Sequence, residues 1–294
     1  MIFRSWLFIP GDNEKMLGKS ESLDADVLVF DLEDAVVESR KTEARALTTA
    51  HLKQGRFGNS SPWVRINALD IPHVMDDLTA IMAGKPAGII LPKCEHADQA
   101  QVIADALDRL EAAHGIAAGQ TKLALVAFES AKGVLNAASY TSVHERVTGL
   151  TWGSEDLSAD IGATSNTDEH GQLTAPYLHA RTACPIAAGA ANVQAVDTAV
   201  LDFKDEDQLI ASCNEARRDG FTGKVAIHPA QLDIINDAFT PSDEEIAHAS
   251  AVVEAFDQQS DSGIVVLEGR MLDRPHLKQA QAVLNLAARY RSSH

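Results

Sequence analysis

Short hydrophobic runs, separated by longer amphipathic stretches, recur about eight times along the chain. The runs are rich in Val, Ile and Leu and are continuous rather than alternating, which is typical of strands buried on both faces of a parallel sheet. The predicted strands cover residues 5–11, 26–35, 63–67, 88–93, 123–130, 147–153, 195–203 and 224–229. Predicted helices between them include residues 13–24, 40–53, 95–114 and 205–219, and two of these helices stop at Gly115 and Gly220.

Eight strand-and-helix units predict an α/β fold, a (β/α)₈ TIM barrel, which we expect to take up residues 1–240. A doubly wound open sheet is the alternative. No G-x-G-x-x-G follows the first strand, so a dinucleotide-binding fold is unsupported.

Residues 241–294 are expected to form a C-terminal helical extension. Its first helix begins at Ser242, with Glu245 placed three residues later as in a capping box. The segment SGIVVLEGR predicts a short strand or hairpin, and a last helix is expected from about Pro275 to Tyr290. An extension of this length after a closed barrel tends to reach another subunit.

Composition and charge narrow the function. Hydrophobic residues make up 45% of the 294 residues, which indicates a globular chain with a large core. The net charge of −17 argues against nucleic acid and anionic membranes as partners, since both attract a positive field. An anionic small ligand stays possible if a local basic patch binds it, with candidates Arg4, Lys15, Lys19, Arg65 and Lys93.

The expected location is the cytoplasm. The three cysteines, Cys94, Cys184 and Cys213, are too widely spaced for a disulfide framework or a zinc knuckle, so we expect reduced thiols. The N-terminus has no pattern of a secretory signal, and no apolar run is long enough to span a bilayer.

Acidic residues stand where two successive predicted strands end: Glu129 in LALVAFES and Asp156 in LTWGSED. Carboxylates at the C-terminal ends of neighbouring barrel strands are a common way to build a divalent-metal site. Such hard oxygen ligands suit Mg²⁺ or Mn²⁺, and the scarcity of Cys and His at these ends argues against zinc. Two carboxylates leave most of an octahedral shell open to water and substrate oxygens.

Charged residues at other strand ends are expected at the same mouth of the barrel. For each of them, a purely structural role is the alternative to a role in the site. The acids Asp31, Glu33 and Asp34 either support Arg65, water or a metal, or form ion pairs only. Lys93 is either a site residue or part of a salt bridge at the rim. His228 is interpreted as a hydrogen-bonded histidine at a strand end rather than as a base.

Several segments together resemble the HpcH/HpaI aldolase and citrate lyase β-subunit superfamily. The resemblance is strongest to its CitE-like branch, which includes malyl-CoA and citramalyl-CoA lyases. The resemblance covers essentially the whole chain with compatible order and spacing. The matching segments are RSWLFIPGDNEKML, VFDLEDAV, WVRIN, LPK, FES, WGSEDLSAD, GKVAIHPAQ and EGRMLDRPHLKQAQ.

This resemblance implies a TIM barrel, usually trimeric or hexameric, that makes or breaks a carbon–carbon bond beside an acyl-CoA thioester with Mg²⁺. It implies that Glu129 and Asp156 bind the metal and, through it, the substrate. It also implies that Arg65 binds the substrate carboxylate.

Three further residues have roles implied by the same resemblance. Asp273 would be the acid/base residue, supplied by a neighbouring subunit, although it stands where an Asp could merely cap a helix. Lys15 and Lys19 would approach the nucleotide end of CoA, although on a helix they could be a solvated face.

The function predicted first is a Mg²⁺-dependent lyase that cleaves or forms a β-hydroxyacyl-CoA, such as malyl-CoA or citramalyl-CoA. Its products would be a 2-oxo acid (glyoxylate or pyruvate) and a shorter acyl-CoA. A malyl-CoA thioesterase and a citrate lyase β-subunit are the alternatives, the latter weakened because carrier proteins are themselves acidic. A metal-dependent aldolase on free 2-oxo acids ranks lower, because the closing segment and the LEDAV motif match the CoA branch better. A non-catalytic scaffold is disfavoured, because the acids, Arg65 and Asp273 are all present.

Overall fold

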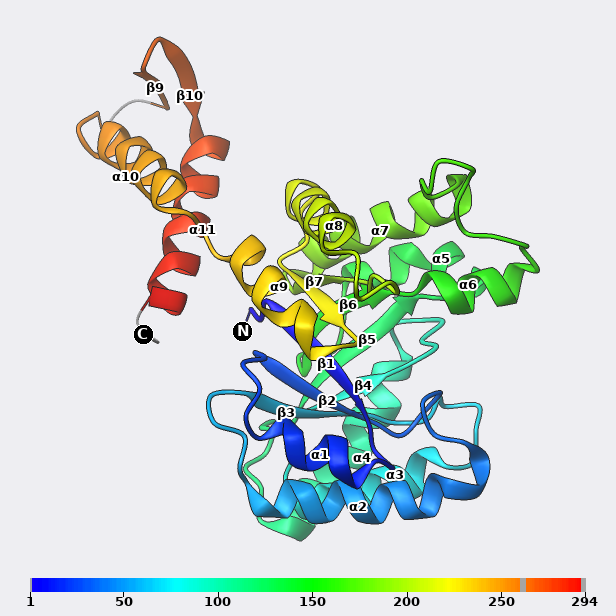
Figure 1. Cartoon of the computed structure of the whole chain (residues 1–294). Coiled ribbons are helices and arrows are strands. Elements are labelled where there is room, and N and C mark those ends of the chain that lie inside the picture. Colours follow the sequence, from blue (N-terminus) through cyan, green and yellow to red (C-terminus); the bar gives the residue numbers. More distant parts are fainter. Residues whose placement is uncertain (1, 260–262, 292–294) are drawn as a thin grey trace. The chain divides into compact units, whose positions relative to one another are not determined.

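The computed structural model describes residues 2–259 and 263–291. Eight parallel strands close into a barrel in chain order, with helices packed around it (Figure 1), so the predicted TIM-barrel fold is confirmed. The strands are β1 (Ser5–Pro10), β2 (Val27–Asp31), β3 (Ser61–Arg65), β4 (Gly88–Leu91), β5 (Lys122–Phe128), β6 (Val147–Trp152), β7 (Gln194–Asp197) and β8 (Gly223–Ala226).

Each predicted strand overlaps an observed one, but the prediction for residues 195–203 runs too far. Strand β7 ends at Asp197, which is also the last residue it pairs with β8. The hydrophobic residues that follow lie in a loop, where Leu201 is 58% exposed. Phe203 stacks on the ring of His228 with 4.4 Å between ring centroids. The predicted strand was too long because the prediction relied on hydrophobicity, and the loop after β7 also contains apolar residues.

All four helices predicted between strands are present, with ends that differ by a few residues. Helix α4 ends as expected at Gly115, whose φ of 61° is the left-handed conformation that favours glycine. The helices of the barrel are α1 (Glu14–Ser20), α2 (Lys41–Gln54), α3 (Val74–Ile81), α4 (Gln99–His114), α5 (Ala131–Leu135), α6 (Ser154–Ile161), α7 (Ala175–Ala191) and α8 (Glu206–Arg218), and α9 (Leu232–Phe239) follows.

Aromatic side chains fill the barrel at the N-terminal ends of its strands. The rings of Trp6 and Trp63 contact each other with centroids 5.0 Å apart, and Phe3 packs on Trp6 at 5.7 Å. Gly88 makes room for this packing, since a Cβ there would lie 2.5 Å from the Trp63 ring. Because this end is filled, the opposite mouth is where a ligand can enter the barrel.

The chain divides into two compact units, Met1–Asn236 and Asp237–His294, whereas the sequence analysis ended the barrel at residue 240. The second unit contains α10 (Asp243–Asp257), a hairpin of β9 (Ile264–Leu267) and β10 (Arg270–Asp273), and α11 (Arg274–Arg291). Its own core includes Val252, Phe256, Val265 and Leu272. The predicted capping box at the start of α10 is present, with Ser242 and Glu245 bonded reciprocally.

Two expectations about the chain as a whole can be compared with the described residues. All three cysteines are buried and free of disulfides, as predicted. Among the described residues, no helix combines the length and apolar character that a membrane crossing needs.

A buried ion pair outside the mouth gives the barrel a pH-dependent stability. The Glu111 carboxylate on α4 accepts hydrogen bonds from Arg146 Nη2 (2.6 Å) and Nη1 (2.8 Å), and from the Thr121 and Gly119 backbone N–H groups (both 2.8 Å). Burial alone would raise the pKa of Glu111, but these donors outweigh it and lower the pKa to about 2.

We therefore expect the stabilisation from Glu111 to be present above pH 4.5, its ordinary pKa, and to be lost as the pH falls toward about 2. Glu111→Gln should lower the free energy of unfolding by about 2–3 kcal/mol at pH 7, and by much less at pH 3. Urea unfolding followed by tryptophan fluorescence measures this, because Trp6, Trp63 and Trp152 all lie in the barrel unit. An equal difference at both pH values would contradict the assignment.

Candidate active site

The barrel mouth holds a cavity of about 390 Å³ at the C-terminal ends of the strands. The residues that line it include Phe8, Asp31, Arg65, Val126, Glu129, Thr151, Asp156, Val225 and Ile227. Sequence analysis placed Asp31, Arg65, Glu129 and Asp156 at strand ends, and the structure brings these four residues to one cavity.

Arg65 at the end of β3 is held rigidly by two acids from the end of β2. Its Nε and Nη2 donate to the two oxygens of Asp31 (2.7 and 2.6 Å), and its Nη1 pairs with Glu33 (2.9 Å). The guanidinium also lies over the Phe8 ring, 5.0 Å from its centroid. Burial alone would lower the pKa of Arg65, but Asp31 and Glu33 raise it, so the group stays charged. Three of its five N–H groups are used, which leaves two for a ligand.

Two buried side chains hold the turn after β2 in place through hydrogen bonds to its backbone carbonyl groups. Lys41 Nζ donates to the carbonyl oxygens of Leu32 and Glu33, both at 2.7 Å. Asn67 Nδ2 donates to the same Leu32 carbonyl at 3.1 Å, and Asp77 holds Asn67 (2.6 Å). Sequence analysis assigned no role to Lys41 or Asn67. The sequence did contain a signal for Lys41, because it falls on the buried face of α2. Lysine is almost never buried without partners, so a lysine at such a position suggests a specific role.

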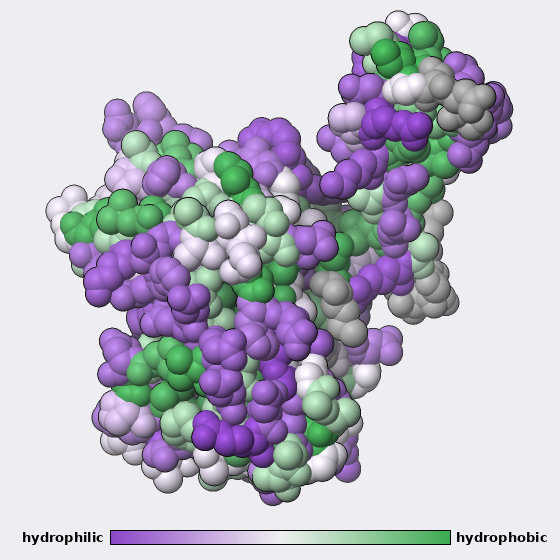
Figure 2. Space-filling view, turned by 180° about the vertical axis from the view of Figure 1, so that it is seen from behind, coloured by the Kyte–Doolittle hydropathy of each residue, from purple (hydrophilic) through white to green (hydrophobic). Residues whose placement is uncertain are grey.

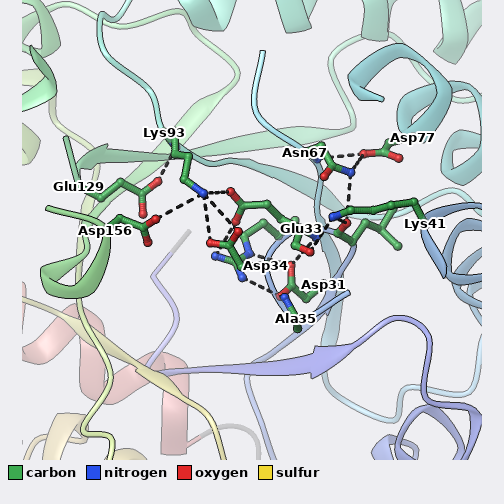
Figure 3. Close-up of polar contacts among 12 residues, drawn as sticks. Asp31, Glu33, Asp34, Ala35, Lys41, Asn67, Asp77, Lys93, Glu129 and Asp156 are labelled. Carbon is green, nitrogen blue, oxygen red and sulfur yellow. Dashed lines mark hydrogen bonds and ion pairs between the residues drawn. The ribbon is translucent and has the colours of Figure 1, made fainter. Parts of the chain in front are cut away.

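Lys93, just after β4, connects the acids on opposite sides of the mouth (Figure 3). Its Nζ lies 2.6 Å from Glu33, 3.1 Å from Asp34 and 3.3 Å from Asp156. Its backbone N–H donates to Glu129. Lys93 has a φ of 48°, an unusual left-handed conformation for a lysine. These contacts make it a residue of the site rather than of a separate salt bridge at the rim.

Glu129, at the end of β5, is a buried carboxylate with a second carboxylate beside it. Burial raises the pKa of Glu129, the charge of Asp156 on α6 raises it further, and the resulting pKa is about 8. Gly153 leaves the space that Glu129 occupies, because a Cβ at Gly153 would lie 3.0 Å from both Glu129 Cβ and Oε2. Gly153, the residue between β6 and α6, therefore lets Glu129 lie close to the start of the helix that carries Asp156.

These features fit a bound divalent cation. Seven titratable side chains gather at the mouth, and the five carboxyl groups outnumber Arg65 and Lys93: Asp31, Glu33, Asp34, Glu129 and Asp156. A cation between Glu129 and Asp156 would relieve the repulsion that raises the pKa of Glu129. Within the described residues, no three or more His, Cys, Asp or Glu side chains form a metal-binding group. Two carboxylates would therefore be the protein's share, with water and substrate completing the shell.

The remaining predicted residues are carried by other elements of the chain. Asp273 ends β10 in the C-terminal unit, is half exposed, and contacts His276 Nδ1 at 2.6 Å. Lys15 and Lys19 are exposed on α1. His228 has a structural role, as predicted: its Nδ1 accepts a hydrogen bond from the Ala230 N–H at 3.1 Å.

Comparisons with known proteins identify the family and several relatives. A model of the HpcH/HpaI aldolase/citrate lyase family matches residues 4–229. A (3S)-malyl-CoA thioesterase from Cereibacter sphaeroides is 35% identical over 284 residues, which are 96% of this chain and 93% of the relative. The mitochondrial citramalyl-CoA lyase of Rattus norvegicus is 34% identical over 300 residues, covering 97% of this chain and 86% of that one. The crystal structure of CitE from Mycobacterium tuberculosis with magnesium, acetoacetate and coenzyme A is 31% identical, has a TM-score of 0.75, and matches over 98% of both chains.

Proposed function

The chain belongs to the HpcH/HpaI aldolase/citrate lyase family, and on this premise we propose that it is a Mg²⁺-dependent carbon–carbon lyase acting on a β-hydroxyacyl-CoA. Candidate substrates are malyl-CoA and citramalyl-CoA, which would give glyoxylate or pyruvate and a shorter acyl-CoA. The named citramalyl-CoA lyase among its relatives supports the lyase class. The solved relative that contains magnesium and coenzyme A supports the metal and the thioester.

The observation that carries the proposal is the pairing of Glu129 and Asp156 in the same cavity as Arg65. A 2-oxo acid has a carboxylate and an adjacent carbonyl, so it needs a cationic donor and a Lewis acid side by side. Arg65 has two N–H groups left for the carboxylate, and its ion pairs hold it in place before the ligand binds. When bound by Glu129 and Asp156, Mg²⁺ supplies Lewis-acid polarisation of the carbonyl.

The proposed chemistry also needs a group that moves a proton at the α-carbon of the acyl-CoA. In cleavage the substrate hydroxyl releases its proton to solvent, from which Asp273 can later recover one, and the bond between the hydroxyl-bearing carbon and the α-carbon breaks. The α-carbon keeps the electron pair and takes a proton. We assign that proton to the carboxyl group of Asp273 from a second copy of the chain, and in synthesis Asp273 removes it.

Two apolar surfaces support a second copy as the source of Asp273. On the β9–β10 hairpin, Val265 and Leu272 are buried, whereas Ile264, Val266 and Met271 on its other face are 49%, 67% and 69% exposed. Figure 2 likewise shows hydrophobic (green) surface on the C-terminal unit. The barrel rim offers Leu201, Phe203 and Ile227, which are 58%, 40% and 37% exposed.

We propose that the hairpin of one copy covers this rim of the next, within a homo-oligomer such as a trimer or hexamer. Asp273 pairs in register with Ile264, so it lies at one end of the apolar hairpin face. Lys15 and Lys19, on the helix that follows β1, are proposed to approach the nucleotide of CoA. A cytoplasmic location belongs to the same proposal.

The test is turnover of malyl-, methylmalyl-, citramalyl- and citryl-CoA by the purified protein with Mg²⁺, followed by mass spectrometry. We expect a 2-oxo acid and a shorter acyl-CoA from at least one of them, and none after EDTA treatment. Free CoA with an intact hydroxy acid would instead identify a thioesterase, the alternative favoured by the Cereibacter relative. No turnover of any of the four would contradict the proposal and favour a carrier-protein thioester or a free 2-oxo acid.

A further inference from the structure

A buried threonine lines the cavity at the barrel mouth, and its hydroxyl has no hydrogen-bond partner among the described residues. Thr151 lies on β6, is 9% exposed, and lines the same cavity as Arg65 and Glu129. Among the described residues, nothing accepts from or donates to its Oγ1. A valine of the same shape would fill this position without burying a polar atom, so the hydroxyl calls for an explanation.

Strand geometry fixes where this hydroxyl lies. Gly149 and Thr151 alternate along β6 and so share one face of it, and Gly153 continues the alternation directly after the strand. Gly153 lies against the side chain of Glu129, which puts Thr151 one layer deeper in the barrel than that carboxylate. In register, Thr151 lies beside Val126 on β5 and Val196 on β7. The hydroxyl is therefore a polar group set in an apolar inner wall.

Only the small end of a substrate can reach this depth, because CoA is far too large for a cavity of about 390 Å³. In the proposed reaction the small end is the carboxylate of the 2-oxo acid, which Arg65 binds from β3. A carboxylate has about four lone-pair positions, more than the two free N–H groups of Arg65 and one metal contact can use. A threonine hydroxyl is a donor suited to the remaining position.

We propose that Thr151 determines specificity for the 2-oxo acid: its hydroxyl donates a hydrogen bond to the carboxylate that Arg65 binds. This inference rests on the proposed function and deepens it. The site would then favour small 2-oxo acids over aldehydes or ketones that lack the carboxylate, because without it the hydroxyl and Arg65 are left unpaired.

The experiment measures binding of glyoxylate and of pyruvate, each with Mg²⁺, by isothermal titration calorimetry. Thr151→Val should weaken binding of the preferred acid about tenfold, whereas Thr151→Ser should stay within about threefold of the wild type. Thr148→Val is the matched control: it is on the same strand, but its hydroxyl bonds to the Leu123 carbonyl, away from the mouth cavity.

A second readout separates this role from a structural one. Without ligand, Thr151→Val should have the same thermal midpoint as the wild type or a higher one, since it removes an unpaired buried hydroxyl. A lower midpoint, or equal binding by Thr151→Val and the wild type, would overturn the inference and leave the proposed function standing. If the wild-type protein binds neither acid with Mg²⁺, the inference and the proposed function both fail.

Discussion

Replacing Glu129 with glutamine is expected to lower kcat/KM by at least about 1,000-fold, since it removes one of the two carboxylate charges proposed to hold the metal. Glutamine keeps the volume beside Gly153 and still offers an oxygen to the Lys93 N–H, so the barrel should fold. Its missing charge leaves Asp156 alone to hold the cation. The measurement is turnover of the best substrate from the CoA-ester panel over a range of Mg²⁺ concentrations.

The folded state without metal gives a separate check on this variant. Because Asp156 repels the charged form of Glu129, removing that charge should keep or raise the thermal midpoint. Added Mg²⁺ should raise the midpoint of the wild type but not of Glu129→Gln. Glu38→Gln is the control, because Glu38 is 75% exposed and pairs only with His73 among the contacts described. Near-normal turnover by Glu129→Gln would remove the metal assignment altogether.

The second large effect is expected at Asp273. Asp273→Asn keeps the size and the hydrogen-bonding capacity toward His276 but cannot exchange a proton, so kcat should fall by about 10²–10⁴-fold. Binding of glyoxylate or pyruvate with Mg²⁺ should be unchanged, because Arg65, Glu129 and Asp156 are intact. A steady-state assay and calorimetry on the same preparation separate the two effects.

Mixing the two inactive variants tests whether Asp273 acts in a neighbouring subunit. Glu129→Gln supplies a normal Asp273, and Asp273→Asn supplies a normal metal site. If equal amounts are unfolded and refolded together, random assembly should restore about one quarter of the sites. If each site used its own Asp273, every site would keep one defect and the mixture would stay inactive. Refolded wild-type protein is the control for recovery.

The parts of this molecule that sequence predicts well are those set by local pattern. The barrel follows from eight continuous apolar runs, and Glu129 and Asp156 stand out because acids end two of them. The end of β7 was misplaced, because the residues after Asp197 are as apolar as a strand although the pairing with β8 has ended. Nothing in the local sequence distinguishes a rim loop of this kind from a strand.

Local sequence patterns could not predict the contacts between strand ends that are far apart in the chain. The sequence left Lys93 undecided, because its role depends on where Glu33 and Asp156 lie in space. Thr151 drew no attention, since a threonine in a hydrophobic run is an ordinary strand residue. Its interest arises only when the closed barrel shows that Thr151 lines a cavity and that its buried hydroxyl has no partner among the described residues.

The backbone at Lys93 implies a conflict between function and stability. A glycine would adopt its φ of 48° with less strain, and replacing left-handed residues with glycine is a common step in stabilising a protein. Here that step would delete the ammonium group that joins Glu33, Asp34 and Asp156. Engineers who seek a more heat-resistant variant should therefore leave position 93 unchanged and direct their changes to the outer helices.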